Sequence, residues 1–345
     1  MRYAALSIVA SACIAAAITV APATAQAAIR THYIAADEVL WNYAPSGRDL
    51  ITGNALPPLD PQQLGWAYHK LVYREYTDAT FTKRVPRPPA DEYMGILGPI
   101  IHAEVGDTVV IVFKNDAPIA TNMAIAGASS RAPAVKPNAT ARYEWRITDA
   151  LGPASHDGSS VGWRYFSTVD EANDESLGLV GALVVTRRGD ARADGSPSDV
   201  DREAFVAFSE QTEGFSRLLD TNVADPAINT RHIKEGPPFS DFTFVNDFFT
   251  INGYVFGNMP MLTLHEGERT RWYVIVTGSG FDAHTPHWHG QTVLDRGMRT
   301  DIIDAQINEV RVVDMVPDNP GIWLFHCHVR LHLAGGMEAR FAVVR

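Results

Sequence analysis

A dense set of metal-binding side chains lies near the C-terminus, in the stretch His326-Cys327-His328 followed by His332 and Met337. A Cys thiolate, two His imidazoles and a weak axial Met form the soft ligand set that selects copper for electron transfer. Cys327, His332 and Met337 supply three of these ligands. The spacing therefore predicts a type 1 copper site whose remaining His lies upstream.

The missing ligand is predicted in a second histidine cluster, which reads His284-Thr-Pro-His287-Trp-His289. If this segment is a strand, His287 and His289 share one face, because successive side chains alternate across a strand. His284 precedes Pro286 and is predicted to turn toward the copper on Cys327.

The same alternation places Cys327 on one face of its strand and both His326 and His328 on the other. We expect these two histidines to join His287 and His289 in a second metal site. Cys327 and its neighbours would then link two metal sites covalently, which suits electron transfer. Copper is the predicted second metal, although four imidazoles also suit zinc or could be relics of a lost site.

Short runs rich in β-branched and aromatic residues, bounded by Gly, Pro, Asn and Asp, carry these motifs and recur through the chain. Clear examples are residues 108–113, 182–186, 271–276 and 310–314. No long helical periodicity competes with them, and only minor helix is predicted, near residues 171–176 and 213–220. The sequence therefore predicts an all-β fold, as a sandwich or barrel.

The chain contains two copies of one unit. Residues 101–112 align with residues 264–276 once a gap is allowed, which predicts two similar domains at residues 28–188 and 201–345. Residues 189–200 between them are small, polar and turn-rich, as expected for a linker.

The first copy lacks the histidines of the second. Ala124 and Ala126 stand at the positions of His287 and His289, and a second alignment puts Phe166 and Thr168 at the positions of His326 and His328. None of these four side chains offers an imidazole. The first domain is therefore predicted to hold no copper.

Residues 1–27 combine Arg2, an apolar stretch and Ala25-Gln26-Ala27, which predicts a secretory signal peptide cleaved before Ala28. The expected location is secreted or periplasmic, with no membrane anchor after cleavage.

Cys327 would be the only cysteine of the mature chain, so we expect it to do chemistry and not to form an internal disulfide. The net charge of −11 disfavours nucleic acid as a partner.

Together with Leu97-Gly-Pro-Ile-Ile-His-Ala-Glu-Val-Gly-Asp107 and Pro320-Gly-Ile-Trp-Leu-Phe325, these motifs resemble the multicopper oxidases, especially the ceruloplasmin-like branch and the two-domain laccases. The resemblance implies tandem cupredoxin-like Greek-key domains, a type 1 copper that takes electrons singly from a small reducing substrate, and a trinuclear cluster that reduces dioxygen. The implied type 1 ligands are His284, Cys327, His332 and Met337. The implied ligands of the second site are His287 (type 2) and His289, His326 and His328 (type 3).

The chain departs from the family in its first domain. The family's cluster also takes ligands from a His-x-His-Gly and a His-x-His there, at the positions that are Ala124, Ala126, Phe166 and Thr168 in this chain. At most half of the cluster's ligands remain, which leaves the number of coppers and the reduction of oxygen open. A mononuclear second copper with an open position, as catalytic metal sites require, is the predicted arrangement.

Other residues bear on the substrate and on the assembly. The ferroxidase branch has an acidic residue just before the second type 1 His, where this chain has Leu331, so a laccase-like activity is favoured over iron oxidation. Asp301 and Asp304 match acidic positions of the branch and are candidates for proton delivery or solvated turn residues. His102 and His265 occupy equivalent repeat positions and are predicted to be structural. Two-domain relatives assemble as trimers, so a homotrimer is expected.

Two functions remain in competition. The first is a copper oxidoreductase that passes electrons from a small reducing substrate through Cys327, His326 and His328 to a second copper, and then to dioxygen or another small acceptor. The alternative is a one-copper electron carrier or copper-binding protein without oxidase activity. A third interpretation, a structural protein without metal, predicts a colourless protein after copper loading.

Overall fold

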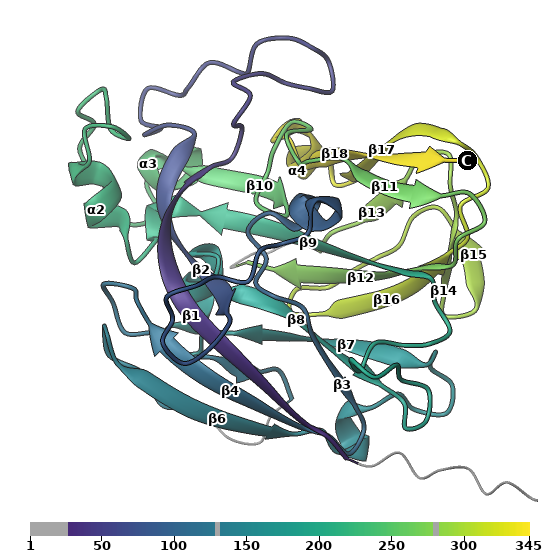
Figure 1. The fold of residues 1–345 in the computed structure, drawn as a ribbon. Helices are drawn as coiled ribbons and strands as arrows, with labels where there is room; N and C mark the ends of the chain where they lie inside the picture. Colours follow the sequence, from purple (N-terminus) through teal and green to yellow (C-terminus); the bar gives the residue numbers. More distant parts are fainter. Residues whose placement is uncertain (1–26, 128–131, 279–282) are drawn as a thin grey trace, which may run out of the picture.

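The computed structural model describes residues 27–127, 132–278 and 283–345, and most of its regular elements are β-strands (Figure 1). The predicted signal peptide lies, apart from its last residue, outside the described residues. Within the described part, no helix is long and apolar enough to cross a lipid bilayer.

The first half of the chain forms two four-stranded sheets, with the orders β2-β1-β4-β6 and β3-β8-β7-β5. Short helical segments join the strands: η1 (Pro89–Met94), η2 (Asp149–Leu151) and α1 (Glu171–Ser176). Helix α1 coincides with one of the two predicted minor helices. The strands are β1 (Ile29–Asn42), β2 (Ala67–Tyr76), β3 (Ile101–Glu104), β4 (Thr108–Asn115), β5 (Ala124–Ile125), β6 (Thr140–Arg146), β7 (Ser160–Phe166) and β8 (Val180–Thr186).

The second half forms a six-stranded sheet, β10-β9-β12-β16-β14-β15, and a four-stranded sheet, β11-β18-β17-β13. Its helices are η3 (Glu213–Phe215), α2 (Leu219–Ala224), α3 (Asp241–Val245) and α4 (Arg330–Ala334). The second predicted minor helix is thus split between η3 and α2. The strands are β9 (Arg202–Thr212), β10 (Asp247–Ile251), β11 (Leu262–His265), β12 (Thr270–Thr277), β13 (Pro286–Trp288), β14 (Val293–Asp295), β15 (Met298–Thr300), β16 (Val310–Met315), β17 (Gly321–Cys327) and β18 (Glu338–Val344).

The two halves share one strand topology. In the first half β1 is parallel to β4 and β3 is parallel to β8; in the second, β9 is parallel to β12 and β11 is parallel to β18. The antiparallel pairs also correspond, since β7 lies between β5 and β8 as β17 lies between β13 and β18. The predicted all-β architecture of two similar units is therefore confirmed. Their bounds and the linker at residues 189–200 stay predictions.

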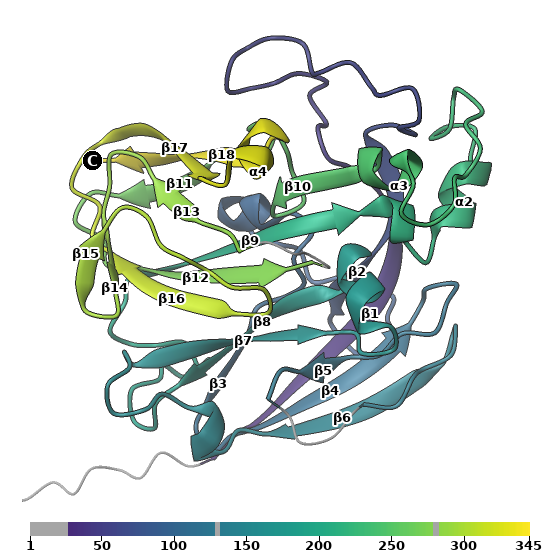
Figure 2. The ribbon, with the colours of Figure 1, turned by 180° about the vertical axis from the view of Figure 1, so that it is seen from behind.

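The halves pack directly on one another. Figures 1 and 2 show the sheets of the first half below those of the second, with β7 next to β16. Strands β8 and β12 are buried along their whole length, because both of their faces are covered, and their sequences accordingly read as nearly continuous apolar runs. One hydrophobic core cluster joins Leu97 and Val184 of the first half to Trp272 and Ile275 of the second.

A buried ionic cluster also crosses the boundary between the halves. Lys70 of β2 forms an ion pair with Glu213 of η3, and both side chains are at most 1% exposed. The ammonium group also donates hydrogen bonds to the Tyr43 hydroxyl (2.9 Å) and to Oε1 of Gln211 (3.0 Å). Burial lowers the pKa of Lys70 and raises the pKa of Glu213, so each charge depends on the other.

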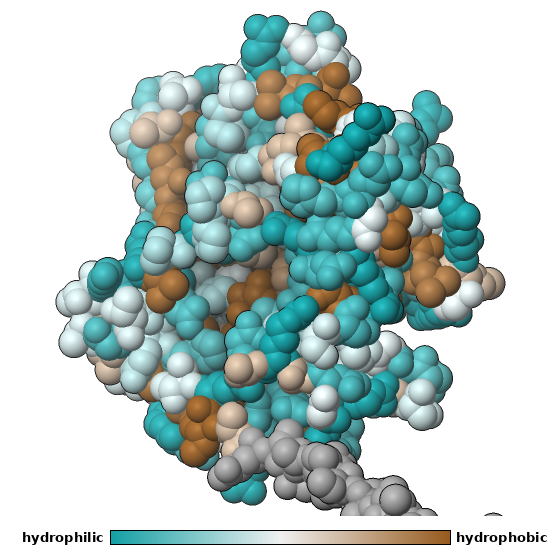
Figure 3. All heavy atoms as spheres, turned by 45° about the vertical axis from the view of Figure 1, so that its right-hand side comes forward, coloured by the Kyte–Doolittle hydropathy of each residue, from teal (hydrophilic) through white to brown (hydrophobic). Residues whose placement is uncertain are grey.

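Hydrophilic side chains dominate the face drawn in Figure 3. Apolar side chains occur on it as small separate groups between polar ones. Scattered exposed apolar residues are ordinary on folded proteins. We therefore attach no docking function to them.

Candidate metal centre

Two paired strands position the candidate ligands. Strands β13 and β17 are antiparallel, with His287 opposite His326 and Pro286 opposite Cys327. Because side chains alternate along a strand, His326 and Cys327 project to opposite sides of β17. The register therefore brings the two histidine clusters of the sequence together.

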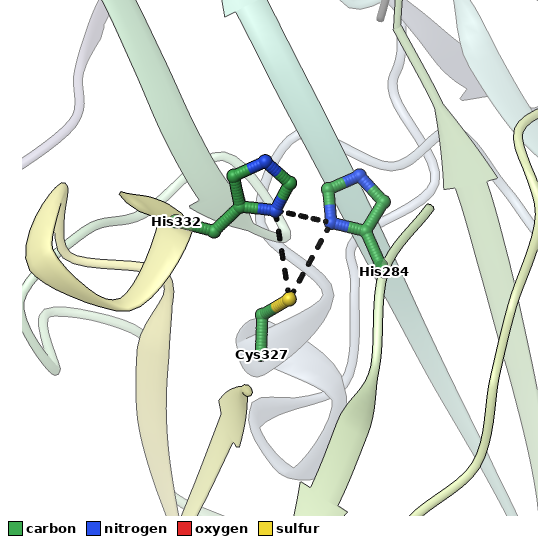
Figure 4. Close-up of side chains that lie close together, drawn as sticks. All are labelled: His284, Cys327 and His332. Atoms are coloured by element: carbon green, nitrogen blue, oxygen red, sulfur yellow. Dashed lines mark hydrogen bonds between the residues drawn. The ribbon is translucent and has the colours of Figure 1, made fainter. Parts of the chain in front are cut away.

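The Cys327 side carries a compact group of three side chains (Figure 4). The Cys327 Sγ lies 3.8 Å from Nδ1 of His284 and 3.5 Å from Nδ1 of His332, and the two Nδ1 atoms are 3.1 Å apart. All three side chains are buried, and their donor atoms point at one another. One sulfur and two nitrogen donors that converge in this way fit a single copper ion.

Met337 is fully buried and is tied to this group through the backbone. The Cys327 N–H donates to the Met337 carbonyl (3.1 Å), and the Met337 N–H donates to the His332 carbonyl (2.9 Å). These bonds fix the loop through α4 that carries His332 and Met337 back onto β17. The segment from Cys327 to Met337 is thus a loop closed by backbone hydrogen bonds.

Two neighbours of this group were missed by the sequence analysis. The Thr285 backbone N–H donates to the Cys327 Sγ at 3.4 Å, and the Phe249 ring stacks on His332 at a centroid distance of 4.5 Å. Hydrogen bonds to the sulfur and apolar surroundings both tune the potential of such a site. Phe249 belongs to β10, far from the motif in sequence, so no local signal could have indicated it.

Burial and the adjacent His332 lower the pKa of His284 from 6.5 to about 3. Folded His284 is therefore neutral at pH values where the unfolded chain, with an ordinary pKa, binds a proton. The unfolded state then carries more protons, so the contribution of His284 to folding stability is fully present above about pH 6.5 and is lost as the pH drops toward 3.

For the metal-free chain we expect His284 to contribute a loss of up to about 1.4 kcal/mol per pH unit over this interval. Urea unfolding between pH 7 and pH 4 measures the slope. In His284→Asn the slope should flatten, whereas in the control His265→Asn, on an exposed histidine, it should not change. If the free energy of unfolding had the same pH dependence in the wild type and in His284→Asn, the lowered pKa of His284 would be contradicted.

The opposite side of β17 carries a group of imidazoles. The His326 Nε2 lies 3.1 Å from Nδ1 of His287 and 3.0 Å from Nε2 of His289. The His326 Nδ1 donates to the Cys327 carbonyl at 2.9 Å, which leaves Nε2 as the nitrogen with a lone pair. Three ring nitrogens thus meet around a point where a metal ion could bind.

His328 lies at the edge of this group and is exposed. Its ring centroid is 5.5 Å from that of His287 and 5.6 Å from that of His326. Asp301 approaches the group from the solvent side, with its Oδ2 3.5 Å from the His287 Nε2. Three of the four predicted ligands therefore converge, and the fourth is adjacent to them.

Electrostatics favour the neutral imidazole at two histidines of this group. Burial lowers the pKa of both His289 and His326, and the neighbouring histidines lower both further. Neutral imidazole is the form that binds a metal ion. The group is therefore prepared for a cation at neutral pH.

Comparison with known proteins gives the family. A family model for multicopper oxidase matches residues 231–345. Human ferroxidase HEPHL1 is 36% identical over 342 residues, which cover 92% of this chain and 29% of the relative. Human hephaestin is 38% identical with the same coverage, and human ceruloplasmin is 34% identical over 92% of this chain and 31% of its own length. The chain belongs to the multicopper oxidase family.

Solved structures agree with this family at the level of the fold. A multicopper oxidase structure superposes with a TM-score of 0.58 and 16% identity over 91% of this chain and 89% of the other. A copper nitrite reductase from Nitrosomonas europaea superposes with a TM-score of 0.60 and 15% identity, over 92% of this chain and 94% of the other. At this identity the likeness shows the fold alone. The predicted cupredoxin-like fold of a multicopper oxidase is confirmed.

The names of the relatives correct one expectation. Leu331 led the sequence analysis to favour a laccase-like activity over iron oxidation. HEPHL1 is named a ferroxidase, so the laccase-like preference is not supported. This member of the multicopper oxidase family spans about a third of the length of these curated relatives.

The first half of this family member keeps the strand pairing of the candidate metal centre without its histidines. Ala124 pairs with Phe166 across β5 and β7, as His287 pairs with His326 in the second half. The Ala126 N–H donates to the Arg164 carbonyl, and Arg164 itself lies over the Phe166 ring at 3.8 Å. The Arg164 guanidinium, which is paired with Glu175, therefore lies beside a position where the second half has a histidine.

The residue equivalent to Cys327 belongs to a network of hydrogen bonds and an ion pair. Ser167 takes the place of Cys327, and its hydroxyl donates to the buried Asp174 carboxylate at 2.6 Å. Asp174 in turn forms an ion pair with Arg217. The Asn122 N–H points to the Ser167 Oγ at 3.4 Å, as the Thr285 N–H points to the Cys327 sulfur. A hydroxyl and a paired carboxylate replace the soft donors of the second half.

The other candidate residues, apart from Asp301, have partners or positions outside both groups. The His102 Nε2 contacts Glu203 at 2.8 Å, and His265 is exposed at the end of β11. Asp304 is 3.3 Å from Arg311, which gives this carboxylate a structural partner. Of the two acidic candidates, only Asp301 reaches a histidine of the metal centre.

Proposed function

We propose that the chain is a secreted copper-dependent oxidoreductase that accepts single electrons from a reducing substrate at the Cys327 group. The observation that supports this most strongly is the convergence of Cys327 with His284 and His332 on one side of β17, backed by three histidines on the other side. Copper held by these groups would supply one-electron redox chemistry.

The chain's own residues provide a short route between the two groups. Cys327 and His326 are consecutive, and the His326 Nδ1 hydrogen bond to the Cys327 carbonyl adds a second connection. The same bond fixes the tautomer and orients the Nε2 toward His287 and His289. The Thr285 N–H donates a hydrogen bond to the Cys327 sulfur, and the apolar Phe249 ring stacks on His332.

Ferrous iron is the first electron donor to test, because HEPHL1 is named a ferroxidase. Leu331, next to His332 in the sequence, is 70% exposed. Its apolar side chain offers no carboxylate that could bind a ferrous ion there. Dioxygen or another small molecule is the proposed acceptor at the histidine group. Assembly as a homotrimer is likewise a proposal, based on the family resemblance.

A second function has its own supporting observation. The first half offers Ala124, Ala126, Phe166 and Thr168 where the family has histidines, and His328 is exposed at the edge of the group. These features favour a one-copper electron carrier in which the remaining histidines hold no metal. The number of coppers separates the two functions.

We expect two coppers per copper-loaded chain, with one type 1 paramagnetic signal and one normal copper signal. In His287→Ala the copper count should fall to one and the normal signal should disappear, while the visible colour remains. The control His265→Ala, which removes an exposed histidine outside both groups, should keep both coppers. Metal analysis and paramagnetic resonance make the measurement. One copper in the wild type, with only the type 1 signal, would favour the carrier.

A further inference from the structure

A cavity of about 820 Å³ lies between the two halves of the molecule, away from the metal centre. Its walls come from β2, the segment through η1, the start of β9 and the turn at Tyr254. None of the histidines or the cysteine of the two donor groups lines it. Its volume is within the range of small-molecule sites, which occur preferentially at domain interfaces.

One end of the cavity carries cationic groups that have no carboxylate partner. Within the described residues, the Arg74 guanidinium makes no hydrogen bond and no ion pair, although the side chain is half-buried. Arg87 is held by the carbonyls of Gly95 (2.7 Å) and Leu97, so its charge is not neutralised either. Both side chains line the cavity, and no Arg74 nitrogen is among the fully buried atoms, so the guanidinium is accessible to a ligand there.

The carboxylates of the cavity do not supply that partner. Glu92 is exposed, and the Asp201 carboxylate accepts the Arg269 N–H. The others contact different side chains: Glu75 contacts His32 at 2.7 Å, Asp91 pairs with Arg202 at 3.3 Å, and Glu203 contacts His102 at 2.8 Å. Among the arginines that line the cavity, Arg84 and Arg202 have a carboxylate within ion-pair distance, whereas Arg74 and Arg87 have none among the described residues.

Burial makes the charged form of Arg74 costly. Burial and, to a smaller extent, the nearby Arg87 and Arg84 lower the pKa of Arg74 to about 10. Arg84 has its own carboxylate, Asp37, at 2.7 Å. An anion bound between Arg74 and Arg87 would relieve this cost, because charge-assisted hydrogen bonds to a guanidinium are strong and directional.

An aromatic wall adjoins the arginines. The Trp41 and Tyr254 rings are in contact, with centroids 5.0 Å apart, and the Trp41 indole N–H donates to the Gly253 carbonyl, which fixes the orientation of the ring. Phe205 and Met94 extend the apolar lining. A ligand for this cavity therefore needs an anionic end and a flat apolar body.

We propose that this cavity binds a small aromatic carboxylate, with the carboxylate on Arg74 and Arg87 and the ring against Trp41 and Tyr254. The chain as a whole is acidic, with a net charge of −11, so its long-range field repels anions. Binding must then come from the local arrangement of these groups.

Calorimetric titration of the mature chain with benzoate tests the proposal, at constant ionic strength. Benzamide, which is neutral and nearly isosteric, and acetate, which lacks the ring, serve as matched probes. We expect benzoate to bind at least about 10-fold more tightly than either, and Arg74→Gln to weaken benzoate at least about 10-fold, as the loss of a charged hydrogen bond predicts. Arg74→Lys, which keeps the charge, should retain part of the affinity.

Arg142→Gln is the control, because Arg142 is an exposed arginine of β6 outside the cavity; it should bind benzoate like the wild type. Without ligand, Arg74→Gln should melt no lower than the wild type, since it removes a cation that has no partner. The proposal is overturned if wild-type protein does not bind benzoate, if benzamide binds equally well, or if Arg74→Gln binds benzoate unchanged.

Discussion

Replacing Cys327 with Ser is expected to remove the intense visible absorption of the copper-loaded protein and to slow oxidation of an electron donor by more than about 100-fold. The colour of a type 1 site depends on the bond between sulfur and copper, and a hydroxyl does not provide it. Residues that only orient metal ligands already cost about 10–100-fold when mutated. Loss of the thiolate itself should cost more.

The substitution is nearly isosteric, so the fold should persist. Ser167→Ala is the matched control, because Ser167 occupies the equivalent position of the first half and contacts Asp174 instead of the two histidines. It should leave spectrum and turnover unchanged, apart from a small loss of stability. Spectroscopy and stopped-flow reduction with ferrous iron make the measurement. A Cys327→Ser protein that keeps its colour and its rate would refute the assignment of the copper site.

Replacing Lys70 with Met is expected to lower the free energy of unfolding by about 3–5 kcal/mol, because it leaves Glu213 buried without its counter-charge. The Glu213 side chain is 1% exposed, and water cannot replace the ammonium group. Denaturant unfolding of the metal-free chain measures the change. Since Lys70 lies on β2 and Glu213 on η3, the loss should affect the packing of the two halves.

The double variant Lys70→Met/Glu213→Leu should recover most of this stability, because both charges are then removed together. Lys114→Met provides the control, since Lys114 and Asp116 form a half-exposed pair that should contribute less than about 1 kcal/mol. If Lys70→Met and Lys114→Met lost equal stability, the buried pair would not hold the halves together as we infer.

Much of the arrangement of the candidate metal centre could be predicted from the sequence because its determinants are local. The alternation of side chains along a strand is enough to separate Cys327 from His326, and the structure places them on opposite sides of β17. The alignment of the two copies is also confirmed at the level of register, since Ala124 pairs with Phe166 as His287 pairs with His326. Periodicity and internal repetition are properties that a single sequence displays directly.

Features that depend on distant contacts could not be predicted in this way. Phe249 reaches His332 only because β10 packs beside α4, and Lys70 meets Glu213 only because the two halves are in contact. The cavity at Arg74 has the same origin, since its walls come from both halves. The exposure of His328 depends on β17 ending at Cys327, a boundary that strand alternation does not specify.

The preserved backbone of the first half has a consequence for how the protein is made. There the strands adopt the same pairing around Ala, Phe, Ser and Thr side chains, with ordinary polar contacts in place of metal donors. This strand pairing therefore does not depend on metal-binding side chains, unlike small zinc domains that are unfolded without their metal. We therefore expect the second half to reach its native shape before it binds copper, so that maturation and metal supply are separate events in time and place.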